Sequence, residues 1–346
     1  MQVHNWGDLA HVVCRPVAFG IQFKQERKRV TSQLDRRLDC HPASPEETLA
    51  AHRNVFDVWP CAPDIEDHLR IRKDLPKSLR ADYFVGTVEG VVATSLQSFT
   101  TNFQIHGRPV KAMQIGSVHT HADFRKQGYA ELLIDFAEKY QAAHGFELSV
   151  LYCDIALAYY EKMGYVKAAS KMGWFKTAEW SADRLAEAPE LVEIDPRDQL
   201  TALMKLHEGA TATRPISVVR DSAYWDYTLR KFPNDLFWAL PGTSGMFDGF
   251  VRIGKRDDRA EIVDWIVAED RDDLLAPLFT GMVKRAEASG FSEVGGWLPD
   301  REPVRRLIEL SDRQKQITMF KPLVEDLVID NELLIAANDF VLIDHV

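Results

Sequence analysis

The chain repeats one order of elements in its two halves. An extended segment at 111–120, a loop, a helical segment at 130–145 and a second extended segment at 146–154 recur as similar segments between residues 260 and 299. This order predicts helices packed on a mixed sheet. Since one hydrophobic core stops growing near roughly 250 to 300 residues, 346 residues favour two such domains in tandem. We therefore expect an α/β fold of the α+β mixed-sheet kind, with a degenerate second copy.

Composition changes along the chain suggest where the domains end. Residues 178–200 are rich in acids, Ala and Pro, which is typical of a boundary. We expect an N-terminal extension at 1–35, a first domain at 36–178 and a second at 190–346. Within the second, the segment DNELLIAANDFVLIDHV (330–346) predicts a closing helix and strand.

Two further segments of the first domain have clear local patterns. Ser44 followed by Pro45, Glu46 and Glu47 is a typical helix start, with a capping side chain and acids in the first turn. The segment 82–108 predicts two strands joined by a turn at Glu89-Gly90.

Composition also narrows the classes of function. The net charge of -10 disfavours a nucleic-acid partner, because an acidic surface repels phosphates. No apolar run approaches the roughly 20 residues that span a bilayer, and the N-terminus lacks a secretory pattern. The four cysteines form no CxxC pair, which disfavours a zinc site or a disulfide framework. We expect a cytoplasmic protein without a membrane partner; the sequence leaves its oligomeric state open, a homo-oligomer included.

The loop RKQGYA (125–130) is the segment of the first half that could bind a ligand. A loop that follows a strand and opens a helix offers unpaired backbone N–H groups at the positive end of the helix dipole, and so can bind an anion. Gly128 lets a ligand approach the backbone, while Arg125 and Lys126 add positive charge. Taken alone, this string is equally compatible with a plain basic entry to a helix.

Two motifs together resemble the GCN5-related N-acetyltransferase (GNAT) superfamily over roughly residues 36–170. The first is its pyrophosphate signature, Arg/Gln-x-x-Gly-x-Gly/Ala, here Arg125, Gly128 and Ala130. The second is its late helix motif, a Tyr before a Lys-x-Gly-aromatic turn, here Tyr160 and the turn at 162–165. One helix and one strand separate the motifs, as in that superfamily.

The resemblance implies roles for individual residues. Main-chain groups of the strand end pair with the pantetheine arm of acetyl-CoA, the loop amides hold its pyrophosphate, and Tyr160 protonates the departing thiolate. Its neighbour Tyr159 is expected in the core. The implied cofactor-binding residues are Val118, His119, Thr120, Arg125, Lys126, Gln127, Gly128, Tyr129 and Ala130.

Transfer of an acyl group to an amine requires a neutral nucleophile, and the sequence identifies the base poorly. His119 and His121 lie beside the cofactor strand and could act directly or through water; Glu89 is an alternative in a turn. The two histidines share a face of the strand, yet the nearest further histidine, His106, is distant in sequence. We therefore expect no metal.

The second half departs from the pattern at the corresponding loop. DRDDLLAPL (270–278) has acids and no glycine, and carboxylates would repel a pyrophosphate. We expect this half to frame the acceptor pocket or a domain interface without binding the cofactor. Its tryptophans are expected in the core rather than in a substrate cavity: Trp225, Trp238, Trp265 and Trp297.

A tandem arrangement with an active N-terminal unit resembles the enhanced-intracellular-survival type of acetyltransferase. In 346 residues we expect no further C-terminal sterol-carrier-like domain of the kind that this group has. The sequence thus favours an N-acyltransferase that moves an acetyl group from acetyl-CoA to a primary amine of a small molecule or a lysine-like acceptor, by direct attack in a ternary complex. The alternatives are a non-catalytic acyl-CoA sensor or scaffold, and an O- or long-chain acyltransferase.

Overall fold

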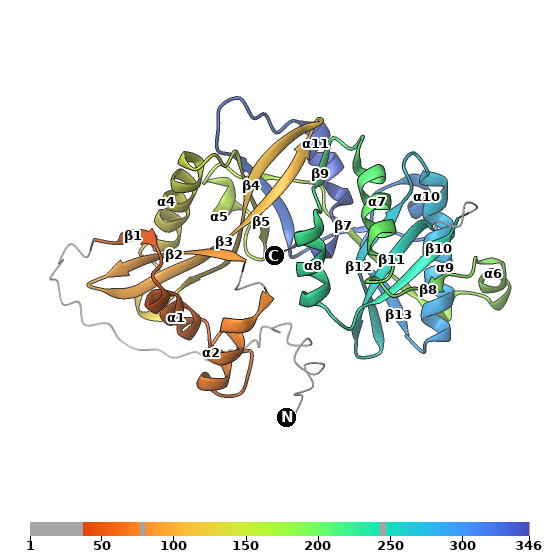
Figure 1. Cartoon of the computed structure of the whole chain (residues 1–346), viewed down its shortest axis with the longest axis horizontal. Helices are drawn as coiled ribbons and strands as arrows, with labels where there is room; N and C mark the ends of the chain where they lie inside the picture. Colours follow the sequence, from red (N-terminus) through yellow and green to blue (C-terminus); the bar gives the residue numbers. More distant parts are fainter. Residues whose placement is uncertain (1–36, 77–79, 243–246, 346) are drawn as a thin grey trace. The chain divides into compact units, whose positions relative to one another are not determined.

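The computed structural model of the chain describes residues 37–76, 80–242 and 247–345. The expected extension at 1–35 lies outside these ranges. The chain forms two compact units: residues up to Phe99 with Ile115–Gln141, and Thr100–Gln114 with all that follows Gln141. The strands that cross from one unit to the other are β3 (Val91–Ile105) and β4 (Arg108–Thr120). Helices and strands of both units are labelled in Figure 1.

The first sheet confirms the expected order of the N-terminal half. Its described strands run β1-β2-β3-β4-β5-β15-β6, and a short β9 pairs with β3. They span Asp39–Pro42 (β1), Ala81–Val88 (β2), Leu148–Cys153 (β5), Val166–Lys167 (β6), Ile216–Val218 (β9) and Ile317–Pro322 (β15). The turn between β2 and β3 lies at Glu89 and Gly90, which both have positive φ as a tight hairpin turn requires.

Helices cover both faces of the first unit's part of this sheet. Phe84 on β2 meets Tyr140 of α4 (Tyr129–Ala143) edge-on at 5.4 Å, while its neighbour Tyr83 meets His52 of α1 (Pro45–Asn54) at 5.2 Å. Since consecutive strand residues face opposite sides, α4 and α1 lie on opposite faces. The predicted start of α1 is confirmed: Ser44 and Glu47 form a capping box. A second helix, α2 (Ile65–Asp74), follows α1.

The second unit contains a separate mixed sheet in the order β14-β7-β13-β12-β11-β10-β8. The two-domain α/β prediction is thus confirmed. The strands span Lys171–Lys176 (β7), Val192–Glu193 (β8), Leu236–Pro241 (β10), Phe247–Arg256 (β11), Arg259–Val267 (β12), Glu293–Trp297 (β13) and Ser311–Asp312 (β14). The helices of this unit are α5 (Ala158–Glu161), α6 (Ala182–Glu187), α7 (Leu200–Thr211), α8 (Ser222–Lys231), α9 (Leu275–Ala288), α10 (Glu302–Arg305) and α11 (Asn331–Ala336).

Alternating side chains of the second sheet enter two different hydrophobic clusters. Trp238 and Val251 pack with α9, whereas Phe237 and Phe250, one position away on the same strands, pack with α7 and α8. The helices therefore cover opposite faces of the sheet, as Figure 1 shows. Trp225, Trp238 and Trp265 are each at most 1% exposed and Trp297 is 5% exposed, so all four are core residues.

The sheets also exchange strands, which the sequence did not reveal. After β6 in the first sheet, β7 joins the second sheet beside β13. Later, β15 returns to the first sheet and lies between β5 and β6. No single point therefore separates the sheets along the chain, and the boundary expected at 178–190 stays a prediction.

The predicted closing strand is wrong. After α11 the chain forms two short 3-10 helices, Ala337–Asp339 and Leu342–Asp344, and the last strand is β15. The apolar alternation of this segment instead places Phe340, Val341 and Ile343 in buried positions. β6 is short, since only Val166 and Lys167 pair with β15.

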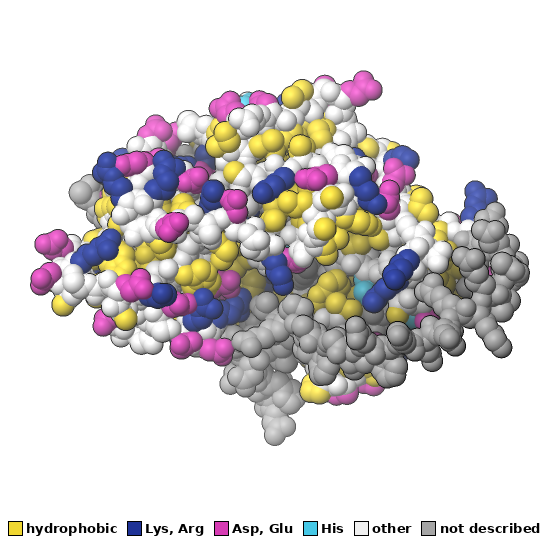
Figure 2. Space-filling model, turned by 180° about the vertical axis from the view of Figure 1, so that it is seen from behind, with side chains coloured by type: hydrophobic (Ala, Val, Ile, Leu, Met, Phe, Trp, Pro, Cys, Tyr) yellow, Lys and Arg dark blue, Asp and Glu magenta, His cyan; other side chains and the backbone are white. Residues whose placement is uncertain are grey.

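Every helix in the described ranges is too short or too polar to cross a membrane. On the face drawn in Figure 2, basic and acidic side chains are interspersed instead of forming a patch of one sign.

A substitution in β13 tests the packing of the second sheet. A Cβ atom at Gly295 would meet the carbonyl oxygen of Gly173 and, at 2.6 Å, the Cα of Trp174 in β7. Because backbone atoms cannot move aside cheaply, we expect Gly295→Ala to lower the free energy of unfolding by about 1 to 3 kcal/mol. The matched control is Gly209→Ala in α7, where nothing lies within 4 Å. Urea denaturation followed by tryptophan fluorescence measures both; equal midpoints would contradict the close packing.

Candidate functional site

The predicted loop lies between the end of β4 and the start of α4. A 3-10 turn at Ala122–Phe124 leads into it, and residues 125–128 are exposed. Lys126 and Gly128 both have positive φ, at 66° and 77°. Left-handed residues next to right-handed ones turn successive N–H groups toward a common side, which makes a concave anion site. The loop therefore has the backbone form that the sequence motif predicts.

The amides of this loop are available to a ligand. Within the described ranges, the N–H groups of Lys126, Gln127, Gly128 and Ala130 have no acceptor. Further along α4, the N–H of Leu132 donates to the carbonyl oxygen of Gly128 at 3.1 Å. The loop thus opens directly into the helix, whose dipole is positive at this end.

The end of the strand before the loop is held on β3. Ser117 of this strand has φ of 51°, in the left-handed region that residues other than glycine rarely adopt. Beyond it, Thr94 Oγ1 donates to the carbonyl oxygen of His119 at 2.9 Å, and the N–H of His121 donates to Ala93 at 2.9 Å. Val118 and Thr120 are half-buried.

Arg125 positions the loop as well as charging it. Its Nε donates to the carbonyl oxygen of Thr120 at 3.0 Å, which ties the loop back to the end of β4. Its side chain is exposed, so its charge is partly screened by water.

The two candidate bases have different environments. His119 is 7% exposed, stacks edge-on with Trp59 at 6.4 Å, and has a buried Nδ1 with no partner in the described ranges. Burial, followed by the charges of Arg125 and His121, lowers the pKa of His119 to about 4. His121 is half-buried and caps the 3-10 turn, with Nδ1 accepting from the N–H of Asp123 at 3.4 Å.

The histidine pair is not part of a cluster that could hold a metal. Among described residues, the metal-ligating side chains that approach one another closely enough are His106, Asp330 and Glu332. All three are exposed, and Asp330 already caps α11 by accepting from the N–H of Leu333. The expectation that the chain holds no metal stays a prediction.

Tyr160 lies in the other unit, on the short helix α5. It is 9% exposed and packs edge-on against Tyr165 at 5.8 Å. Burial raises its pKa, so the hydroxyl is protonated at neutral pH and can donate a proton. The Lys-x-Gly-aromatic motif forms the expected turn: Gly164 has positive φ, and the N–H of Tyr165 donates to Tyr160 at 3.2 Å. Tyr159, expected in the core, is only half-buried.

Sequence reasoning missed a polar cluster in the first unit. His52 Nε2 hydrogen-bonds to Tyr83 Oη at 2.8 Å, and Gln97 Nε2 donates to the same oxygen at 2.5 Å. These residues line a small cavity with Arg72 and Ser117. No sequence pattern could have found the cluster, because its members come from α1, α2, β2, β3 and β4.

The loop of the second unit has the opposite chemistry, as predicted from its acids. Arg271 donates to the carboxylate of Asp273 through two bonds of 2.8 Å, and Arg301 pairs with both Asp272 and Asp339. Carboxylates occupy the position that corresponds to the loop at 125–130, and they pair with arginines.

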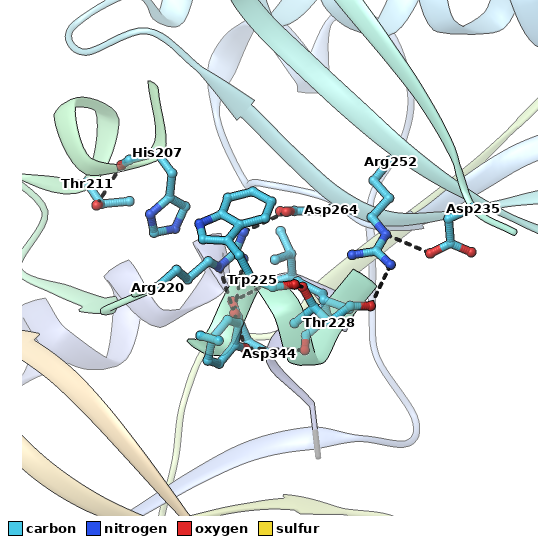
Figure 3. Close-up of polar contacts among 12 residues, drawn as sticks. His207, Thr211, Arg220, Trp225, Thr228, Asp235, Arg252, Asp264 and Asp344 are labelled. Carbon is cyan, nitrogen blue, oxygen red and sulfur yellow. Dashed lines mark hydrogen bonds and ion pairs between the residues drawn. The ribbon is translucent and has the colours of Figure 1, made fainter. Parts of the chain in front are cut away.

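A cluster of buried, oppositely charged side chains lies in the second unit (Figure 3). Arg220 lies between Asp264, at 2.6 Å, and Asp344, at 3.0 Å. Arg252 pairs with Asp235 at 2.7 Å and donates to the carbonyl oxygen of Thr228 at 2.8 Å. Buried charges are stable only when paired and hydrogen-bonded. This cluster therefore has a structural role, and it anchors the C-terminal segment through Asp344.

The candidate site lies in a part of the chain that matches a known family. The sequence model of the acetyltransferase (GNAT) domain family matches residues 40–168. This range includes β4, the loop at 125–130 and Tyr160. No curated protein matches the sequence.

Solved structures are similar over most of the chain. A probable N-acyltransferase of unknown function from Enterococcus faecalis is 14% identical, with a TM-score of 0.67, and the match covers 83% of this chain and 73% of that one. Eis1 from Mycobacterium abscessus is 14% identical, with a TM-score of 0.58 and coverages of 83% and 74%. A tandem GNAT protein from the clavulanic acid biosynthesis pathway is 14% identical, with a TM-score of 0.50 and coverages of 84% and 100%.

At such identities the similarity establishes the fold, while the family match identifies the N-terminal domain. The loop and its motif lie inside the matched range, and the two sheets give the tandem arrangement. Over residues 40–168 the chain therefore belongs to the acetyltransferase (GNAT) domain family, and its two sheets have the fold of tandem GNAT proteins.

Proposed function

We propose that the chain is an acetyl-CoA-dependent N-acyltransferase whose N-terminal domain transfers the acetyl group to a primary amine of a small molecule or of a lysine-like acceptor. One observation carries this proposal. The loop at 125–130 combines two left-handed residues, four unpaired amides and the start of a helix, inside the range that matches the GNAT family. Such a loop complements a pyrophosphate.

The remaining groups fit direct attack in a ternary complex. The amine nitrogen attacks the thioester carbonyl, a C–N bond forms, and the C–S bond breaks. The CoA thiolate leaves with a proton, for which the protonated hydroxyl of Tyr160 is the proposed donor. The amide backbone groups at 118–120 are proposed to pair with the pantetheine arm.

The amine must also lose a proton. A lysine-like amine with pKa near 10.4 is mostly charged at pH 7, a deficit of about 3.4 units or roughly 4.6 kcal/mol. His119 is neutral at this pH and can accept a proton, but a pKa of about 4 makes it a weak base. A proton taken by His119 must therefore pass on to water, and His121 stays an alternative.

Thiol release from acetyl-CoA across a panel of amines tests the activity. Free lysine, polyamines, aminoglycosides and a lysine peptide form the panel, with long-chain acyl-CoA and hydroxyl acceptors as comparison arms. We expect turnover with at least one amine. If acetyl-CoA raises the melting temperature while no acceptor gives turnover, the chain is a sensor or scaffold instead.

Gly128→Asp tests the loop. The new carboxylate would repel the pyrophosphate, and we expect the affinity for acetyl-CoA to fall at least about tenfold. Gly145→Asp at the other end of α4 is the matched control, because its φ of 80° is close to the 77° of Gly128 and neither site has atoms within 4 Å of an added Cβ. Calorimetric titration measures both; equal affinities would refute the loop assignment.

Tyr160→Phe tests the proton donor. Loss of the hydroxyl should lower kcat roughly 100-fold, in the range of general acid catalysis, while the affinity for acetyl-CoA changes little. Tyr159→Phe on the same helix is the control and should retain activity. An unchanged kcat in Tyr160→Phe would remove this residue from the mechanism.

A further inference from the structure

Arg72 is a buried cation without a carboxylate partner in the described ranges. It lies in the last turn of α2 and is 7% exposed. Its Nη2 donates to the carbonyl oxygen of Trp59 at 3.0 Å, but its Nε is buried with no acceptor. Buried arginines are almost always paired, because an isolated charge is costly to remove from water. An unpaired one therefore indicates a ligand.

The groups around Arg72 leave its charge uncompensated. Burial, and then the charges of Arg72 and His68, lower the pKa of His52 to about 4, so His52 is neutral. Tyr83 is engaged by both His52 and Gln97. In the same cavity, Gln97 Oε1 is a buried acceptor with no donor among the described residues. The cavity thus offers one unmatched cationic donor and one unmatched acceptor.

The position of this cavity relates it to the reaction. Ser117 of β4, which has a positive φ, lines the cavity together with Arg72 and Gln97. Val118–Thr120, proposed to pair with the pantetheine arm, follow directly along the strand. All of these residues belong to the first unit. An acceptor held here would lie beside the arriving thioester.

Resting on the function proposed above, we propose that Arg72 binds a carboxylate of the acceptor, so that the substrates are amines that also carry a carboxylate group. One carboxylate oxygen of the acceptor accepts from Arg72 Nε. The cavity has a volume of about 10 Å³, about the space of one water, so it can take a single oxygen of the ligand.

Pairs of amines that differ by one carboxylate test the proposal. L-lysine is compared with 1,5-diaminopentane, and 4-aminobutyrate with propylamine. We expect the wild-type kcat/KM to be roughly 10- to 100-fold higher for the carboxylate member of each pair, in the range of a hydrogen bond to a charged group. Butyrate, which lacks the amine, should inhibit competitively against 4-aminobutyrate.

Arg72→Met should bring both ratios close to one by lowering kcat/KM for the carboxylate members alone, and Arg72→Lys should restore part of the preference. Arg70→Met is the matched control on the same helix, because Arg70 is exposed and pairs with Asp67 at 2.6 Å; it should leave the ratios unchanged. The melting temperature and its rise with acetyl-CoA verify folding of each variant.

Equal kcat/KM values for the two members of each pair in the wild type would overturn the proposal, as would ratios that survive in Arg72→Met. A cavity that holds only water gives this result. Turnover of propylamine and 1,5-diaminopentane would then persist, so the acyltransferase function would stand. Absence of turnover with every amine would instead refute the function itself. If Arg72→Met does not fold, the wild-type ratios and the butyrate inhibition still decide the question.

Discussion

Two hydrogen bonds between β4 and β3 determine where the candidate site can form. Beyond Ser117, which has a positive φ, Thr94 and Ala93 of β3 hold His119 and His121. The end of the strand is therefore fixed. The loop at 125–130 starts from this fixed point, and Arg125 ties it back to Thr120. The amides of the loop are preorganised and need little ordering when an anion binds.

The two halves share the order strand, loop and helix, but the residues of the loop differ between them. In the first, glycine and unpaired amides follow the strand; in the second, Asp272 and Asp273 follow it and pair with Arg301 and Arg271. The second sheet is also filled by tryptophans and by the ion pairs of Arg220 and Arg252. These interactions give the second half a core of its own that contains paired charges. The chain passes from the first sheet to the second before β7 and returns to the first sheet at β15, so two segments of the chain connect the sheets.

Local patterns predicted the elements well because each depends on neighbouring residues. Capping by Ser44, the turn at Glu89 and Gly90, and the loop before α4 all follow from residues within a few positions. The exchange of strands was not predictable, since β7 and β15 have apolar patterns that fit either sheet.

The prediction of a closing strand was wrong for a different reason. The alternation of apolar and polar residues at 340–345 is also compatible with 3-10 turns that bury the same apolar side chains. Asp344 then pairs with Arg220, more than a hundred residues earlier in the sequence. Likewise, Arg72, Tyr83 and Gln97 meet only in the folded unit, so no spacing in the sequence indicates their cavity.

Hydrogen–deuterium exchange with and without acetyl-CoA tests the central claim most directly, because it reports on backbone amides at both loops in one experiment. The account predicts that acetyl-CoA slows exchange in peptides covering residues 125–131 and leaves peptides covering 270–275 unchanged. Protection of the second loop, or of neither, would contradict it.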